Sequence, residues 1–297
     1  MKKTLAMMTA AMMVAGALAG CGSSSSTPVA TTAEATTAAA TEAATTEVAT
    51  TEAGDTAAAA EGTVKTPSGK FTVGFDQEFP PMGFVGDDGQ FTGFDLDLAK
   101  EVASRLGLEF VPQPINWDAK DMELDSGNID CIWNGFTMQG REDAYTWVGP
   151  YMANNQVFVV TADSDIASKA DLAGKAVEVQ KDSSGLAALQ GDAELSASFG
   201  SMTEVADYNT ALMDLESGAC DAVCMDSIVA GYQIKSSGKD MKILDDTLSA
   251  EEYGIGFKQG EDELAKAVYD TLMAMKDDGT VAKISNDWFG SDVFTLK

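Results

Sequence analysis

The stretch GFDLDLAKEVASRLGLEFVPQPI, Gly93 to Ile115, decides the fold class of this 297-residue chain. Apolar residues recur in it at helical spacing: Leu98, Ala99, Val102, Ala103 and Leu106. Gly107 follows the last of them and is suited to end a helix, because glycine adopts the left-handed conformation that helix ends favour. The run from residue 108 to residue 115 then predicts a strand. A helix followed directly by a buried strand is typical of an α/β sheet.

Strands are also predicted on both sides of this unit. FTVGF, Phe71 to Phe75, alternates apolar residues and predicts a strand that begins near Lys70. Pro80 and Pro81 end it in an extended loop. After a short helical segment, DCIWNGF (residues 130–136) predicts another strand. The order strand, helix, strand, helix, strand indicates a parallel α/β arrangement.

The second half of the chain repeats this pattern weakly. ELDSGNIDCIWNG and DLESGACDAVCMD both turn at Ser-Gly and enter a short strand, which places Gly135 opposite Asp226. The carboxyl ends of such strands are where α/β sheets bind ligands. Extended stretches at 154–161 and 251–257 predict two hinge strands between two lobes. The first lobe is expected to comprise residues 67–158 and 252–297, including a helix at 262–279 with a core-facing stripe, and the second lobe residues 159–251.

The N-terminal region predicts export. Lys2 and Lys3 precede an apolar run that ends at LAGC, Leu18 to Cys21, which is typical of a secretory signal over residues 1–21. The small residues before Cys21 favour a bacterial lipoprotein signal, in which this cysteine becomes the lipidated N-terminus. The alternatives are an ordinary signal peptide with a chance cysteine, or a membrane-spanning anchor. Residues 22–66 are rich in Ser, Thr, Ala and Glu and predict a flexible stalk.

The composition excludes several classes of function. Acidic residues outnumber basic ones by 47 to 19, for a formal net charge of -28, so nucleic acid is not an expected partner. The chain contains no histidine, which excludes Ser-His-Asp catalysis and histidine-ligated metals. The cysteines form no C-x-x-C pair, and Cys131, Cys220 and Cys224 are expected to be small buried hydrophobes. We therefore expect neither a cofactor nor a metal. We also expect the protein to be a monomer.

Arg141, in NGFTMQGRED (Asn134 to Asp143), is one of two arginines in the chain. Arginine suits the recognition of a planar carboxylate, because its guanidinium donates two parallel hydrogen bonds. The alternative is a surface ion pair with Glu142 or Asp143, worth about 0–1 kcal/mol. The residues alone leave both interpretations open.

From residue 70 to the C-terminus the chain resembles the solute-binding proteins of polar amino-acid ABC transporters, the bacterial extracellular family 3 type. Four groups of segments carry the resemblance: FPPMGF with GFDLDLAKEVASRL, SGNIDCIWNGFTMQGRED, GPYM with DLAGKAVEVQKDSSG, and DDGTVAKISNDWFG. GFDLDLAKEVASRL is the most specific of them. The resemblance implies the type II periplasmic-binding-protein fold, with two α/β lobes that close around one free amino acid.

The resemblance also implies roles for individual residues. Arg141 corresponds to the arginine that binds the α-carboxylate, assisted by Thr137 and by the backbone around Asn134 and Gly135. Ser183 and Ser184 are implied as further carboxylate donors from the second lobe, and Asp226 as the acceptor of the α-ammonium. The walls of the site would be Phe79 and Trp117, and its side-chain end Asp76 and Gln180. The commoner family pattern has one more residue between the threonine and the arginine than TMQGR.

Bland alternatives remain for two of these assignments. Asp226 beside Ser227 also fits a helix N-cap, and Phe79 and Trp117 also fit a hydrophobic core. The end of the site that would receive the substrate's side chain predicts a polar or cationic amino acid. Asp76, with Glu78 nearby, favours a cationic side chain. Asp76 together with Gln180 would also bind an amide.

The expected function is that of an extracytoplasmic lipoprotein, held at the cell membrane by Cys21, which delivers its amino acid to ABC permease subunits. It is not expected to be an enzyme. The alternatives are a secreted dehydratase on the same fold and a surface adhesin or sensor. A dehydratase would need a general acid, and a carboxylate or Lys181 is all that the chain offers.

Overall fold

The computed structural model describes residue 66 and residues 68–297, and most of its strands form one eight-stranded sheet. In the order of the sheet they are β5 (Glu109–Pro114), β1 (Lys70–Phe75), β6 (Cys131–Thr137), β11 (Met241–Lys258), β7 (Tyr145–Thr161), β10 (Ala222–Asp226), β8 (Ala176–Gln180) and β9 (Ser201–Val205). A small second sheet contains β2 (Glu78–Phe79), β3 (Gly83–Val85) and β4 (Phe91–Thr92).

The pairing of the strands divides the large sheet into two parallel groups. β5, β1 and β6 pair in parallel, and so do β10, β8 and β9. The long strands β7 and β11 lie between these groups and pair with each other and with their neighbours in antiparallel fashion. We call the first group with its helices the first lobe and the second group with its helices the second lobe. The two-lobed α/β fold with two hinge strands is therefore confirmed.

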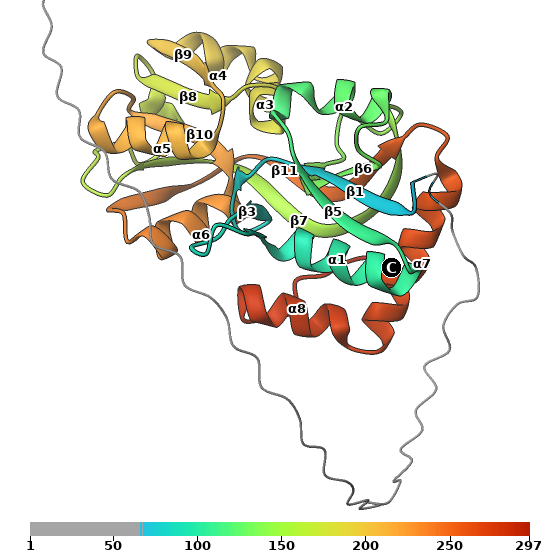
Figure 1. Ribbon diagram of the computed structural model, residues 1–297. Helices are drawn as coiled ribbons and strands as arrows, with labels where there is room; N and C mark the ends of the chain where they lie inside the picture. The colour runs from blue at the N-terminus through green and yellow to red at the C-terminus, as the bar shows by residue number, and fades with distance from the viewer. Residues whose placement is uncertain (1–65, 67) are drawn as a thin grey trace, which may run out of the picture. The chain divides into compact units, whose positions relative to one another are not determined.

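The helices divide in the same way. Those of the first lobe are α1 (Phe94–Leu106), η1 (Trp117–Ala119), α2 (Lys120–Ser126), α7 (Asp262–Asp277) and α8 (Thr280–Phe289). Those of the second lobe are η2 (Lys169–Leu172), α3 (Ser184–Gly191), α4 (Ala193–Ser198), α5 (Tyr208–Ser217) and α6 (Ser227–Ser237). In Figure 1, α1, α7 and α8 lie together, and all three contact one another.

The helix over residues 94–106 forms as its sequence predicts. Its apolar stripe is buried except for the half-buried Leu106, two aspartates in its first turn favour the positive end of the helix dipole, and Gly107 ends it in the left-handed conformation. The C-terminal helix α7 likewise buries the predicted stripe of Leu264, Val268, Leu272 and Met275. Cys131, Cys220 and Cys224 are buried free thiols, as expected.

The hinge strands are longer than the sequence predicts. The stretches 154–161 and 251–257 are parts of β7 and β11, which pair from Met241 with Thr161 to Lys258 with Tyr145 (Figure 1). The sequence Gly149–Pro150 suggests a break, but it lies opposite a bulge between Tyr253 and Ile255, where a proline without an N–H costs no ladder bond.

Three predictions from the sequence stay predictions. The signal peptide with Cys21 and the stalk lie outside the described residues, apart from the stalk's residue 66. The exact lobe boundaries at 158/159 and 251/252 stay predictions, because β7 and β11 run continuously through them.

Candidate functional site

A small chamber lies between the two lobes where β6 and β10 end. It is lined by Phe79, Trp117, Gly135, Thr137, Arg141, Gln180, Ser183, Ser184 and Asp226. All nine are among the residues proposed from the sequence, and they come from both lobes. The volume of the chamber is ≈ 10 Å³, about the room that one water molecule needs. The opposing walls are therefore nearly in contact.

Arg141 lies in the turn after β6, and its guanidinium faces this chamber. Nη1 donates to the Thr137 carbonyl (3.2 Å) and Nη2 to the Asp182 carbonyl (3.4 Å), while the group lies 5.1 Å from the centre of the Phe136 ring. Within the described part of the chain, Arg141 forms no ion pair, so the predicted alternative with Glu142 or Asp143 is not what the structure contains. Because a guanidinium has five N–H donors, Arg141 keeps capacity for a carboxylate.

The start of α3 supplies further donors beside Arg141. Ser183 is the N-cap of this helix, and its hydroxyl accepts a hydrogen bond from the Leu186 N–H (3.1 Å). Ser184 follows it, and its Oγ accepts from Thr137 Oγ1 of the other lobe (3.2 Å). A helix N-terminus carries a partial positive charge and unpaired N–H groups, which favour an anion. This end of the chamber therefore suits a carboxylate.

Asp226 gives the chamber its negative end. It occupies the N-cap position of α6 but makes no capping hydrogen bond, so the N-cap alternative holds for the backbone only. Its Oδ1 instead accepts from Asn154 Nδ2 (2.7 Å), Gln156 Nε2 (2.9 Å) and the Tyr253 hydroxyl (2.8 Å). Burial and, next, the charge of nearby Glu251 raise the pKa of Asp226 well above its usual range.

Two aromatic side chains form walls of the chamber. Phe79 is 6% exposed and packs against Tyr208, with ring centres 5.9 Å apart. Trp117 packs edge-on against Phe136 at 5.6 Å. The alternative that these aromatics belong to the core is thus partly right, because each of them contacts another aromatic residue and also lines the chamber.

Gly135 lies against Phe79 and Tyr253, and the structure leaves no room there for a larger residue. Its φ of +56° is in the left-handed region, and a Cβ would lie 2.9 Å from Phe79 Cε1. Its N–H donates to Asp95 Oδ2 (2.7 Å), which also accepts from the Tyr151 hydroxyl (2.8 Å). The fully buried Asp95, whose pKa burial raises to about 7, therefore fixes this part of the chamber wall.

Asp76 and Asn134 do not line the chamber itself. Asp76 Oδ2 accepts from Gln180 Nε2 across the lobes (2.6 Å), and burial raises the pKa of Asp76 to about 6. Asn134 Oδ1 accepts a hydrogen bond from the Asp76 N–H (3.0 Å), so this asparagine fixes the backbone of Asp76. Both residues thus connect to the chamber through Gln180, which lines it, and their roles in binding stay predictions.

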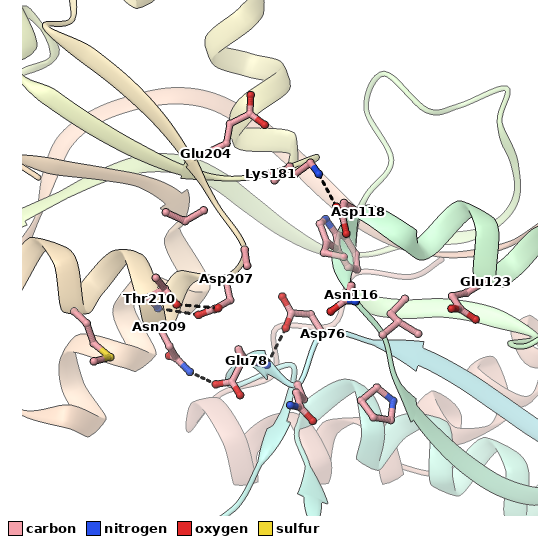
Figure 2. Close-up of a pocket in the computed structure, with 17 residues that line it drawn as sticks. Asp76, Glu78, Asn116, Asp118, Glu123, Lys181, Glu204, Asp207, Asn209 and Thr210 are labelled. Atoms are coloured by element: carbon pink, nitrogen blue, oxygen red, sulfur yellow. Dashed lines mark hydrogen bonds and ion pairs between the residues drawn. The ribbon is translucent and has the colours of Figure 1, made fainter. Parts of the chain in front are cut away.

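Asp76 also lines a larger cavity of ≈ 1020 Å³ that shares Trp117 with the chamber. Figure 2 shows Asp76, Glu78 and Asp207 gathered near one another in this cavity, with Lys181 and Asp118 on another side. Its lining contains six acidic side chains and one basic one: Asp76, Glu78, Asp118, Glu123, Glu204, Asp207 and Lys181. A cavity of one dominant charge raises the local concentration of the opposite ion, here a cation.

Two ion pairs join the two lobes near the chamber. Lys120 Nζ, on a side chain only 2% exposed, bonds to the carboxylate of Asp182 and lies 5.2 Å from the centre of the Trp117 ring. Beside it, the exposed Lys181 pairs with Asp118 at 2.7 Å. The pairs cross, because each lobe contributes one lysine and one aspartate. Contacts of this kind form only where the lobes meet.

Sequence reasoning missed the buried polar residues that form hydrogen bonds with the chamber's lining residues Asp226 and Ser184. Asn154, Gln156 and Glu251 lie on the hinge strands and are buried there. A signal was present, because Asn154 and Gln156 are two residues apart and so share one face of a strand that is otherwise apolar. Lys120 gave no signal, because a lysine at the start of a short amphipathic helix is usually exposed.

Comparison with known proteins identifies the family. Residues 71–291 match the family described as bacterial extracellular solute-binding proteins, family 3. The chain belongs to this family. It is 31% identical over 231 residues to the L-cystine-binding protein TcyJ of Escherichia coli, which covers 76% of this chain and 84% of that protein. The L-cystine-binding protein TcyA of Bacillus subtilis is 31% identical over 229 residues, covering 76% and 83%.

Solved structures agree with this assignment. A histidine-bound substrate-binding protein of an ABC uptake transporter from Streptococcus pneumoniae has a TM-score of 0.74 and 34% identity, covering 77% of this chain and 95% of the other. Tv2483 bound to L-arginine has a TM-score of 0.73 and 28% identity, covering 77% and 93%. The relatives and solved structures that this chain resembles are thus amino-acid-binding proteins, one of them from an ABC uptake transporter. The dehydratase and adhesin alternatives are not favoured, because the family binds solutes and is not one of enzymes.

Two further observations concern the surroundings of the site. Family members act outside the cytoplasm, and no helix in the described part of the chain is long and apolar enough to cross a membrane. Within the same residues, no three His, Cys, Asp or Glu side chains are grouped so that they would hold a metal ion.

Proposed function

We propose that this protein captures a free L-amino acid with a positively charged side chain, such as arginine or lysine, and delivers it to an ABC permease. The observation that carries the proposal is the placement of Arg141, which has no ion-pair partner among the described residues, and Asp226 in the lining of one chamber. A zwitterion needs a cation with donors for its carboxylate and an anion for its ammonium. Arg141, Thr137, Ser183 and Ser184 fill the first role and Asp226 the second.

The side chain of the substrate is assigned to the space beyond Trp117. Asp76 and the acidic cavity behind it favour a cation, because a positive group there would offset the repulsion among Asp76, Glu78 and Asp207. Phe79 and Trp117 would enclose the aliphatic part. Histidine-bound and arginine-bound structures among the similar proteins support this choice.

L-cystine is a second candidate. Two curated relatives bind it, and the cavity of ≈ 1020 Å³ is large enough for its second amino-acid group. Lys181 lies in that cavity and would receive the second carboxylate. The structure offers fewer cations than this substrate needs, since Lys181 already pairs with Asp118.

Closure of the lobes follows from this division of contacts. Arg141 and Thr137 belong to the first lobe and Ser184 and Asp226 to the second, so one small molecule satisfies all of them only when the lobes meet. Substrate therefore shifts the equilibrium towards the closed form by its preference for that form. The permease would recognise the closed surface. We further propose that a lipid on Cys21 holds the protein, as a monomer without enzymatic activity, at the outer face of the cell membrane.

A thermal-shift panel tests the substrate class. The full chain is heated with each of the twenty amino acids and with L-cystine, and a ligand at about 100 times its dissociation constant should stabilise it by roughly 2.7 kcal/mol. Arginine and lysine are expected to give the largest shifts and glutamate none. A largest shift with glutamate or leucine would contradict the assignment of the side-chain end. No shift with any of them would contradict binding of a free amino acid.

Replacing Asp76 with asparagine separates the cationic from the amide interpretation. The substitution keeps the shape and removes the charge, so binding of L-arginine should weaken about tenfold, within the range of a charge-assisted hydrogen bond. Binding of L-glutamine should change little. Asp207→Ala is not a suitable control because Asp207 caps α5, but Glu123→Gln removes an acid from the same cavity lining at a more distant point. Equal losses for both ligands, measured by calorimetry, would contradict a role for the charge of Asp76.

A further inference from the structure

Glu251 is a buried carboxyl group beside Asp226 that the proposed function does not yet use. It is 5% exposed, and two amide groups bridge it to Asp226. Asn154 Nδ2 donates to Asp226 Oδ1 (2.7 Å) and to Glu251 Oε1 (2.6 Å), and Gln156 Nε2 donates to the same two oxygens (2.9 Å each). Because the same nitrogen atoms serve both oxygens, the two carboxyl groups lie in one polar cluster.

This cluster is located at the hinge. Glu251 on β11 stands opposite Asn154 on β7, and Gln156 on β7 stands opposite Asp226 on β10. The four residues therefore connect both hinge strands with the last residue of a second-lobe strand. A change of charge at Asp226 therefore occurs in contact with β7 and β11, the two strands that join the lobes.

Few other groups compensate the two acids. In the described part of the chain, neither Asp226 nor Glu251 forms an ion pair with a lysine or arginine. The titratable and charged groups that face the cluster are Tyr253 of β11, Tyr208 of α5, Cys224 of β10 and, across the chamber, Arg141. Burial raises the pKa values of Tyr253, Tyr208 and Cys224, so these three stay neutral at neutral pH.

Two carboxylates in one buried site repel each other, and ionising both costs far more than ionising one. We infer that this cluster holds one proton, at Asp226, because the neighbouring Glu251 opposes a second negative charge in the same buried site, and that the α-ammonium of the substrate favours its release, so that binding is linked to pH. The inference rests on the proposed function in one respect, namely that an ammonium binds at Asp226. Glu251 acts through Asp226, as a positioning residue for charge.

The sign of the linkage follows from the charges. An ammonium beside the pair stabilises its ionised form and lowers its pKa in the complex. Affinity should therefore rise with pH across the interval between the pKa in the complex and the higher pKa in the free protein, by at most about tenfold per pH unit for one proton. Above that interval affinity should level off.

A first experiment needs no ligand. Thermal unfolding of the full chain is followed from about pH 5 to about pH 8, a range in which strongly raised carboxyl pKa values fall, for the wild type, Glu251→Gln and Glu252→Gln. A group with a raised pKa in the folded state contributes its stability at low pH and loses it as pH rises. The wild type should thus lose stability relative to Glu251→Gln on going to higher pH. Glu252→Gln, the same change at the exposed next residue, should follow the wild type. Parallel curves of stability against pH for the wild type and Glu251→Gln would overturn the inference that Glu251 keeps a proton on Asp226.

A second experiment measures the linkage itself. Calorimetric titrations with L-arginine over the same pH range, in two buffers of different ionisation enthalpy, give the dissociation constant and the number of protons released. The wild type should release up to one proton, and Glu251→Gln clearly fewer. Titration of Asp76 contributes equally to both proteins and cancels in their difference. Proton release that is absent in the wild type, or equal in both, would overturn the linkage.

The two experiments separate the inference from the proposed function. Failure of L-arginine to bind the wild type at any pH would contradict the proposed substrate and the linkage. The ligand-free unfolding curves test by themselves whether the cluster holds a proton in the free protein. If Glu251→Gln does not fold, the proton count is measured with Asp76→Asn, which removes the other raised carboxyl group next to the ligand. Release of up to one proton would then support the linkage, and a count of zero would overturn it.

Discussion

Replacing Arg141 with methionine is expected to weaken binding of L-arginine by roughly 30- to 5,000-fold, or about 2–5 kcal/mol. The guanidinium lies against Phe136, donates to two backbone carbonyls and forms no ion pair among the described residues, so its charge is uncompensated beside the chamber. The substitution would leave the substrate carboxylate without a cation in a nearly closed space. Titration calorimetry of the full chain measures the loss.

The other arginine provides the control. Arg105 pairs with Glu101 (2.8 Å) and Asp278 (2.6 Å) on the first lobe and does not line the chamber. Arg105→Met removes the same charge and should leave affinity almost unchanged. A ligand-side arm uses L-argininamide, which lacks the carboxylate and should bind wild type and Arg141→Met with similar weak affinity. Equal effects of the two arginine variants on L-arginine would contradict the role of Arg141.

Replacing Lys120 with methionine is expected to weaken binding by roughly 5- to 150-fold, the range of a coupling free energy of about 1–3 kcal/mol. The ammonium of Lys120 is buried between the Trp117 ring, the Trp117 carbonyl and Asp182 of the other lobe. Desolvation lowers the pKa of Lys120, and the carboxylate of Asp182 opposes that shift. Because the pair joins the lobes, its energy is present only in the closed form. Methionine keeps the apolar stem and removes the bridge.

Lys181→Met is the matched control for this prediction. Lys181 also crosses between the lobes, to Asp118, but both side chains are about half exposed, and such pairs contribute about 0–1 kcal/mol. Its effect on affinity should be several-fold smaller. Stopped-flow release of substrate should show that Lys120→Met mainly raises the rate of dissociation. Equal losses in both variants would indicate that burial of the Lys120 pair does not matter for closure.

The sequence predicts the two-lobed fold well because its signals are local. The apolar stripe at residues 98–106, Gly107 at the helix end and the alternation at 71–75 are each sufficient to define their element. The chamber was predicted for a different reason, since the assignments of Arg141, Thr137 and Asp226 came from a family resemblance and from the repeated Ser-Gly turns. The structure brings these side chains together, and their contacts with a ligand stay a proposal.

What the sequence did not reveal depends on contacts between distant residues. Glu251 and Asp226 are 25 positions apart, and Lys120 and Asp182 are 62 apart, so no local pattern links either pair. The full length of the hinge strands was not predicted, because β7 and β11 extend by pairing with each other, from Met241 with Thr161 to Lys258 with Tyr145. The bond between Asp76 and Gln180 of the other lobe (2.6 Å) also joins residues that are 104 positions apart, and a contact of Asp76 with the substrate stays a proposal.

The most direct test of the whole account is a crystal structure of the protein grown with the amino acid that gives the largest thermal shift. We predict that the α-carboxylate lies within hydrogen-bond distance of Arg141 and the start of α3, the α-ammonium at Asp226, and the side chain past Trp117 towards Asp76. Ligand density away from the chamber, in the ≈ 350 Å³ cavity beside Ile129 and Leu264 for example, or a carboxylate bound away from Arg141, would contradict this prediction.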